Sequence, residues 1–140
     1  MGSFTRDPAD WLRRLSPDEW IRAALGELQR ATAAYAGGSA RAGAAGVKRA
    51  AGMALNAALI VEPDDAWGRT YVEHVAALAK DDRAPQAVRV ACRTVLDAKG
   101  PSGDVVSLRT PRAHEPVVDA AHDVIAHAWA VVRRHEAKGE

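Results

Sequence analysis

Apolar residues recur every three or four positions along most of the chain, which is the spacing of an amphipathic helix. The first long stretch predicts a helix over about 17–36, with a capping signature at Ser16 and Glu19 and a stop at Gly37. A short helix is expected ahead of it, over 8–15. The chain is therefore expected to begin with a short helix that folds back over a longer one.

A second helix is expected from Ser39, which can cap it, to about Val61, where Glu62-Pro63 ends it. It contains several glycines, each of which lowers intrinsic helix stability by roughly 1 kcal/mol. A close approach of neighbouring helices over these small residues would compensate. The polar side of this helix is expected to carry Arg41, Lys48, Arg49 and Asn56.

The second half of the chain continues the helical pattern. A third helix is expected from Asp64 to near Lys80, a fourth from Asp82 to Lys99 and a last one from Pro116 to about Arg134. His74 falls on the inward stripe of the third helix and Trp129 on that of the last. The stretch 100–115 is rich in Pro, Gly, Ser and Arg, and irregular stretches of this length in small domains often carry function.

These elements together predict an all-α fold. Short connections between long helices favour an antiparallel bundle, here of four long helices plus a short N-terminal helix. The length of 140 residues fits a single helical domain, with the short helix over 8–15 and the bundle over 17–136. Because the chain has 31 Ala and only one Phe, its core is expected to consist mostly of small aliphatic side chains.

Charge and cysteine content limit the partners and the cellular compartment that are expected for this protein. Nineteen basic and eighteen acidic residues leave a net charge of +1, which supplies no overall attraction to nucleic acid or to an anionic membrane. There is no uninterrupted apolar run of about 18 residues, so no membrane span is expected. The single Cys92 and the lack of a secretory leader pattern favour the cytoplasm.

Motifs with strong predictive value are absent. The sequence has no phosphate-binding P-loop, no G-x-G-x-x-G, no paired cysteines, no H-E-x-x-H and no G-x-S-x-G. Nucleotide hydrolysis, zinc-dependent DNA recognition and serine-hydrolase chemistry are therefore disfavoured, and no cofactor is expected.

An Arg-x4-His spacing occurs twice, as Arg109 with His114 in the irregular stretch and as Arg69 with His74 in the third helix. Such a pair can act on RNA without a metal, because the imidazole takes the proton of a ribose 2′-hydroxyl and the guanidinium stabilises charge on phosphorus. Chance predicts about as many matches to so loose a spacing. A buried bundle histidine at 74 and a solvated one at 114 are therefore the alternatives.

Two further groups of polar residues are candidate binding sites. Asp119, His122 and Asp123 are neighbours on one helix face, but a metal site in a bundle needs ligands from other helices, so no metal site is predicted. Arg89, Arg93 and Arg112 would form a basic patch if the fourth helix and the irregular stretch lie together. Such a patch would suit RNA phosphates rather than duplex DNA, because it lacks base-reading side chains.

Two segments carry a resemblance to a known family. The segment 48–59 (KRAAGMALNAAL) and the segment 108–116 (LRTPRAHEP), followed by an alanine-rich last helix, resemble HEPN domains over about 18–134. The resemblance implies a helical bundle that pairs as a homodimer, often beside a nucleotidyltransferase-like protein partner. It also implies a shared endoribonuclease site, which Arg109 and His114 match, with Arg69 and His74 as the fallback.

The chain departs from the family pattern where the family usually has Asn, Asp or His after the arginine, because Thr110 and Thr70 stand there. Many HEPN relatives lack catalytic residues and serve in binding or assembly. Three functions follow as hypotheses. The first is a dimeric HEPN-like interaction module, the second is a metal-independent endoribonuclease of toxin type, and the third is an unrelated bundle that binds a metal or small ligand.

Overall fold

The fold is seen in a computed structural model, which describes residues 4–99 and 114–139. Within these residues the chain is helical, with no strand, which confirms the all-α prediction. The helices are α1 (Pro17–Ala36), α2 (Ala40–Val61), the single-turn 3-10 helix η1 (Asp65–Trp67), α3 (Tyr71–Ala79), α4 (Gln86–Leu96) and α5 (Glu115–Gly139).

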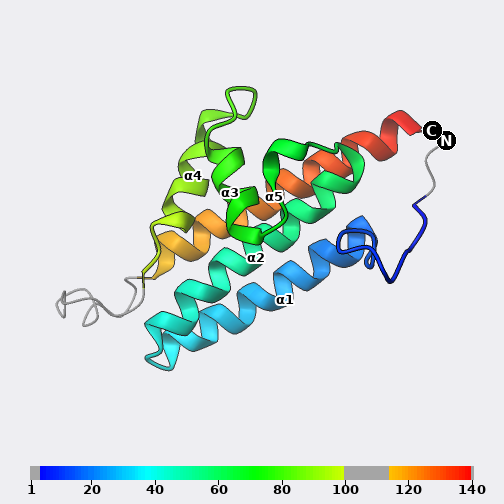
Figure 1. Cartoon of the computed structure of the whole chain (residues 1–140). Helices are drawn as coiled ribbons and strands as arrows, with labels where there is room; N and C mark the ends of the chain where they lie inside the picture. Colours follow the sequence, from blue (N-terminus) through cyan, green and yellow to red (C-terminus); the bar gives the residue numbers. More distant parts are fainter. Residues whose placement is uncertain (1–3, 100–113, 140) are drawn as a thin grey trace.

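Three long helices form the frame of the molecule, and two short ones cover it. Figure 1 shows α1, α2 and α5 side by side, with α3 and α4 packed across α2 and α5. The central helix is α2, which contacts the other four α-helices. The expectation of four long helices was therefore wrong, because α3 has 9 residues and α4 has 11.

The long helices do not alternate in direction throughout. α1 and α2 are antiparallel, since Tyr35 near the end of α1 packs on Gly43 near the start of α2. α2 and α5 run the same way in Figure 1, and the side chain of Glu62, which follows α2, meets His135 in the last turns of α5 at 2.7 Å. The expected fully antiparallel bundle was not found. The short helices α3 and α4 lead the chain back toward the end of the molecule where α2 begins, so that α5 runs in the same direction as α2 (Figure 1).

The N-terminal segment, residues 4–15, contains turns and bends over 8–15 and no helix, so the expectation of a helix over 8–15 was wrong. The side chain of Asp10 accepts hydrogen bonds from the backbone N–H groups of Leu12 (2.7 Å) and Arg13 (3.1 Å). Such a local bond offers the backbone an alternative to the helical ladder. Leu12 and Leu15 nevertheless pack against the core, as expected.

The helix expected over 64–80 is broken in two. Gly68 adopts φ +70°, a left-handed conformation that glycine tolerates, and turns the chain between η1 and α3. A new capping box starts α3, in which Thr70 Oγ1 accepts from the N–H of Glu73 and the Glu73 carboxylate accepts from the N–H of Thr70.

Other helix ends differ by a few residues. α4 begins at Gln86 instead of Asp82, because Pro85 is extended (ψ 143°) and a proline disfavours helical geometry in the residue before it. α5 runs from Glu115 to Gly139, beyond the expected Arg134. Ser39 stands at the N-cap of α2 without a side-chain capping bond.

Small residues bring the helices together, as the glycines of α2 predicted. A Cβ on Gly46 would lie 2.7 Å from Cβ of Ala31 on α1, and a Cβ on Gly52 would collide with the backbone of Tyr71 on α3. α2 is long and apolar enough to cross a membrane by length and composition, and 72% of its most apolar window is buried among the other helices. That degree of burial is typical of a central core helix.

Two side chains lie where the helical pattern did not place them. Asn56 was expected on the polar side of α2 but is 1% exposed, because α2 is surrounded by its neighbours. Trp129 was expected to face inward but is 49% exposed on α5.

Candidate functional site

The first predicted catalytic pair cannot be followed in full. Arg109 lies outside the described residues, as does Arg112 of the predicted basic patch. His114 is half-buried just before α5, and its ring stacks on Tyr35 of α1 at a centroid distance of 5.0 Å and an angle of 5°. The pair Arg109 and His114 therefore stays a prediction.

The fallback pair is fully described and meets around one tryptophan. Arg69 precedes α3, and its guanidinium lies over the Trp11 ring at 5.2 Å. His74, in the second turn of α3, has its ring 5.8 Å from that of Trp11 and 6.4 Å from that of Trp67. The structure thus brings Arg69 and His74 to the same tryptophan.

His74 has no exposed surface. Its Nδ1 donates to the carbonyl oxygen of Trp67 at 2.9 Å, because a carbonyl can only accept. Burial lowers the pKa of His74, although the bond to Trp67 and the nearby Glu73 act in the opposite direction. The imidazole is therefore a neutral core group whose Nε2 is left as an acceptor.

The N-terminal segment covers this histidine and is fixed by polar contacts. Trp20 Nε1 donates to the carbonyl of Leu12 at 2.7 Å, and Arg6 pairs with Glu19 at 2.6 Å. A general base must reach the proton that it removes. In this arrangement His74 meets a substrate only after Trp11 has moved.

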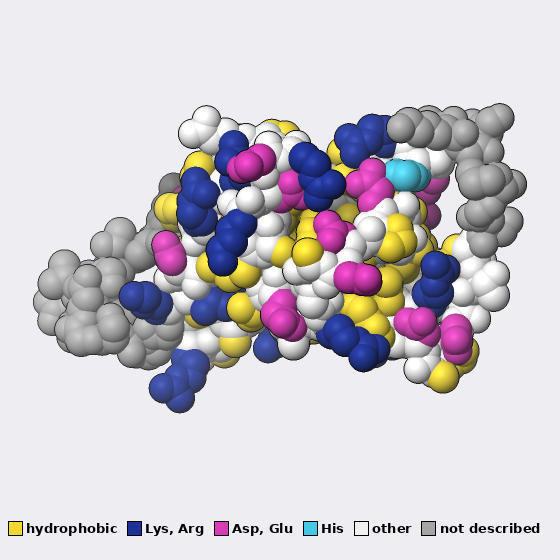
Figure 2. Space-filling model, turned by 45° about the horizontal axis from the view of Figure 1, so that its top comes forward, with side chains coloured by type: hydrophobic (Ala, Val, Ile, Leu, Met, Phe, Trp, Pro, Cys, Tyr) yellow, Lys and Arg dark blue, Asp and Glu magenta, His cyan; other side chains and the backbone are white. Residues whose placement is uncertain are grey.

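The two described members of the predicted basic patch lie one turn apart on α4. Arg89 is half-buried, and its Nε is buried without a partner among the described residues, while one of its terminal nitrogens lies 3.9 Å from Asp82. Arg93 is exposed and donates to the carbonyl of Ala79 at 3.5 Å. Figure 2 shows basic and acidic side chains interspersed over the face it draws.

Metal ligands do not gather in the described part of the chain. No group of three or more His, Cys, Asp or Glu side chains converges there. Asp119, His122 and Asp123 are each exposed on α5, as expected for a solvated polar face.

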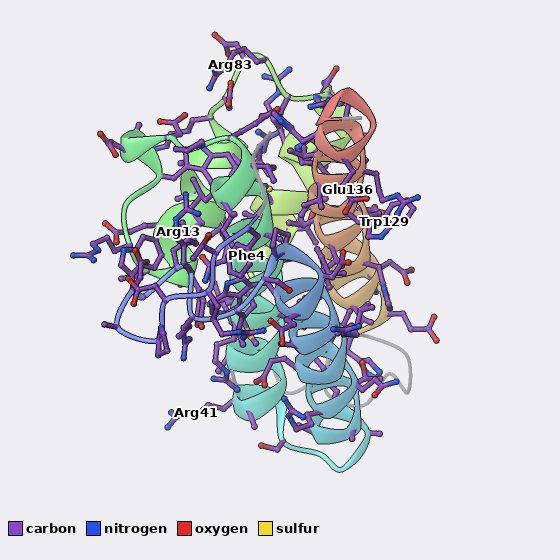
Figure 3. The ribbon with its side chains drawn as sticks, turned by 90° about the vertical axis from the view of Figure 1, so that its right-hand side faces the viewer. Phe4, Arg13, Arg41, Arg83, Trp129 and Glu136 are labelled. Atoms are coloured by element: carbon purple, nitrogen blue, oxygen red, sulfur yellow. The ribbon has the colours of Figure 1, made fainter. Side chains whose placement is uncertain are left out.

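A mixed-charge pocket of about 210 Å³ lies between the end of α2 and α5. Glu62 there pairs with Arg134 (3.5 Å) and with His135 (2.7 Å), and both contacts lower the pKa of Glu62, with the His135 bond the larger cause. Arg83 bridges Asp64 and Asp81 on the far side of the pocket, and Figure 3 shows it at the edge of the molecule. Three carboxylates therefore face two arginines in this pocket, because Arg83 is shared by Asp64 and Asp81 while Arg134 pairs with Glu62.

Sequence reasoning missed a second hollow, beside the Arg69 pair. Asn56 of α2 lines it together with Trp11 and Arg69, and the buried Oδ1 of Asn56 has no hydrogen-bond partner among the described residues. The sequence feature that could have indicated this hollow is Asn56, an isolated polar residue in the apolar run MALNAALI. It was overlooked because Asn56 was assigned to the solvent-facing side of the helix.

Comparisons with known proteins add no family. No family model matches the chain, and neither the curated proteins nor the solved structures contain a match.

Proposed function

We propose that this protein is a HEPN-like helical interaction module that pairs with a second copy of itself through the α1/α5 face. We define that face by Leu25 of α1 and Trp129 of α5, which are 40% and 49% exposed. The observation that carries the proposal is Trp129, a large aromatic side chain that points outward from α5 in Figure 3.

One ion pair and one pocket indicate which way the side chains of Leu25 and Trp129 project. Residues two positions apart on a helix point about 200° apart. Glu27 of α1 pairs with Arg49 of α2 at 2.6 Å, so Leu25 lies on the flank of α1 that faces away from Arg49. His127 lines the pocket beside η1 and α3, so Trp129 lies on the flank of α5 that faces away from this pocket.

The chemistry of the α1/α5 face suits a protein partner. Tryptophan and arginine are the side chains most enriched at the energetic centres of interfaces. Arg133 lies over the Trp129 ring at 5.3 Å, a cation–π contact that favours this position of the ring. A symmetric pair would bury both copies of Trp129 in one isologous contact.

Binding is favoured over catalysis by the state of the fallback pair, because His74 is buried and its Nδ1 is engaged. The resemblance to HEPN domains also implies pairing. A nucleotidyltransferase-like partner and RNA stay predictions of that resemblance, as do the Arg109 and His114 site and a cytoplasmic location.

The test is sedimentation equilibrium of the wild type and two charged variants. Trp129→Asp is expected to weaken self-association by at least about tenfold, since it replaces a central aromatic contact by a charge. Val72→Asp is the matched control, because Val72 is also 49% exposed but lies on α3. A monomeric wild type, or equal weakening by both variants, would refute the proposed face.

A further inference from the structure

A hollow of about 520 Å³ lies where the N-terminal segment, α2 and the start of α3 meet. It is lined by Trp11, Arg14, Asn56, Arg69, Thr70 and Tyr71. A space of this volume is within the range of small-molecule sites, which are typically apolar with a few placed polar groups. The hollow lies apart from Leu25 and Trp129, which do not line it.

The charged side chains that line the hollow are both arginines. Arg14 lies over the Trp20 ring at 4.9 Å and donates to the hydroxyl of Tyr71 at 3.5 Å, while Arg69 lies over Trp11. Within the described residues neither arginine forms an ion pair. Guanidinium groups placed by aromatic faces keep N–H donors for an anion.

Asn56 gives the hollow a second polar feature. It is 1% exposed, and its Oδ1 is buried with no hydrogen-bond partner among the described residues. A buried acceptor without a donor is costly, and native proteins seldom retain one without a reason. Because Asn56 lines the hollow, a turn of its amide would present this acceptor to the N–H of a ligand there.

A second unsatisfied acceptor lies behind Trp11. Nε2 of His74 is buried without a partner in the described part of the chain, and the His74 ring lies 5.8 Å from that of Trp11. Asn56 and His74 are the two buried polar side chains among the described residues. Both are therefore near Trp11, and each retains an acceptor atom.

We propose that this hollow binds a small heterocycle that carries a carboxylate or a phosphate. The anionic group lies at Arg14 and Arg69, and a ring N–H donates to Oδ1 of Asn56. Tyr71 and Trp11 supply aromatic walls for the ring. A primary amide has one acceptor and two donors, so it pairs with a ring edge on which N–H and C=O groups are adjacent, as in a pyrimidine-dione.

Calorimetric titration of the full chain separates the contributions of ring and anion. The probes are uridine 5′-monophosphate, orotate as the carboxylate counterpart, uridine as the ring alone and inorganic phosphate as the anion alone. At least one charged heterocycle is expected to bind saturably, at least about tenfold more tightly than uridine or phosphate. The proposal would be overturned if neither uridine 5′-monophosphate nor orotate bound saturably. It would also be overturned if inorganic phosphate bound as tightly as either of these two probes.

Two variants locate the binding. Arg69→Gln is expected to weaken it by at least about tenfold, because a charge-assisted contact is lost. Arg41→Gln is the control, since Arg41 is exposed on α2 and does not line the hollow. Equal binding by Arg69→Gln and Arg41→Gln would refute the site.

Asn56→Leu tests the buried acceptor by a readout that needs no ligand. Leucine has a similar shape and no polar atom, so the variant is expected to unfold at a higher urea concentration than the wild type while it loses binding. A variant that binds as well as the wild type, or that unfolds at lower urea, would show that Asn56 is already satisfied by the protein and would overturn the proposal.

Discussion

His74 makes the stability of the protein depend on pH. Its pKa is lowered in the folded state, chiefly because burial disfavours the imidazolium. The unfolded chain therefore binds more protons than the folded chain below the ordinary histidine value of about 6.5. Stability is expected to fall as pH decreases through that value and to keep falling until the folded pKa is reached.

His74→Phe is expected to reduce this pH dependence, since the variant has no titrating group at the buried site, while His127, whose pKa burial also lowers, retains part of it. Urea midpoints at about pH 7 and about pH 5 measure the effect, which is at most about 1.4 kcal/mol per pH unit for one group. His122→Phe is the control, because His122 is exposed on α5. The same pH dependence in both variants would contradict the assignment to His74.

At single residues, the helical pattern predicted the burial of some side chains and misplaced others. The inward position of His74 followed from the spacing and was confirmed, since the side chain has no exposed surface. Asn56 was misplaced because the second half of α2 is packed on several sides, so that its polar flank is covered there, whereas Arg41 and Arg49 in the first half are exposed. Trp129 was misplaced because it stands at the edge of the inward stripe of α5, where a few degrees of rotation decide exposure.

At the scale of elements, the start of α3 depends on one capping box. Thr70→Ala removes the acceptor for the N–H of Glu73 and is expected to cost about 1 kcal/mol of stability. Ser39→Ala is the matched control, because Ser39 stands at the N-cap of α2 without a side-chain bond. Chemical denaturation measures both, and an equal loss in the two variants would contradict this role of Thr70.

The existence of the helices was predictable, and their boundaries were less so. Ser16 and Glu19 marked the start of α1, and the capping box was confirmed. Thr70 and Glu73 carry the same signature, but it was passed over because the apolar spacing runs on through η1. The positive φ of Gly68 that divides the two helices could have been suspected only from the glycine itself.

At the scale of the whole molecule, periodicity predicted the fold class but not the directions of the helices. α2 and α5 run the same way, and no apolar spacing carries that information. The contacts that fix it join distant segments, such as Glu62 with Arg134 and His135. The candidate hollow could not be predicted from periodicity either, because Trp11, Asn56 and Arg69 come together only when the N-terminal segment crosses α2 and α3.

The single cysteine makes the proposed pairing easy to probe. Cys92 is fully buried, and burial raises the pKa of its thiol to about 12, so it should react slowly with maleimides in the native protein. An introduced surface cysteine can therefore be followed against a low background. Ala126 is exposed on α5 one turn before Trp129, and Val72 is exposed on α3.

The most direct measurement of the central claim is crosslinking of these two positions with a short bismaleimide. Ala126→Cys is expected to give a covalent dimer in high yield, because a symmetric contact at the α1/α5 face brings the two copies of residue 126 close together. Val72→Cys is expected to stay monomeric. Dimers from Val72→Cys at the same yield, or none from Ala126→Cys, would contradict pairing through the α1/α5 face.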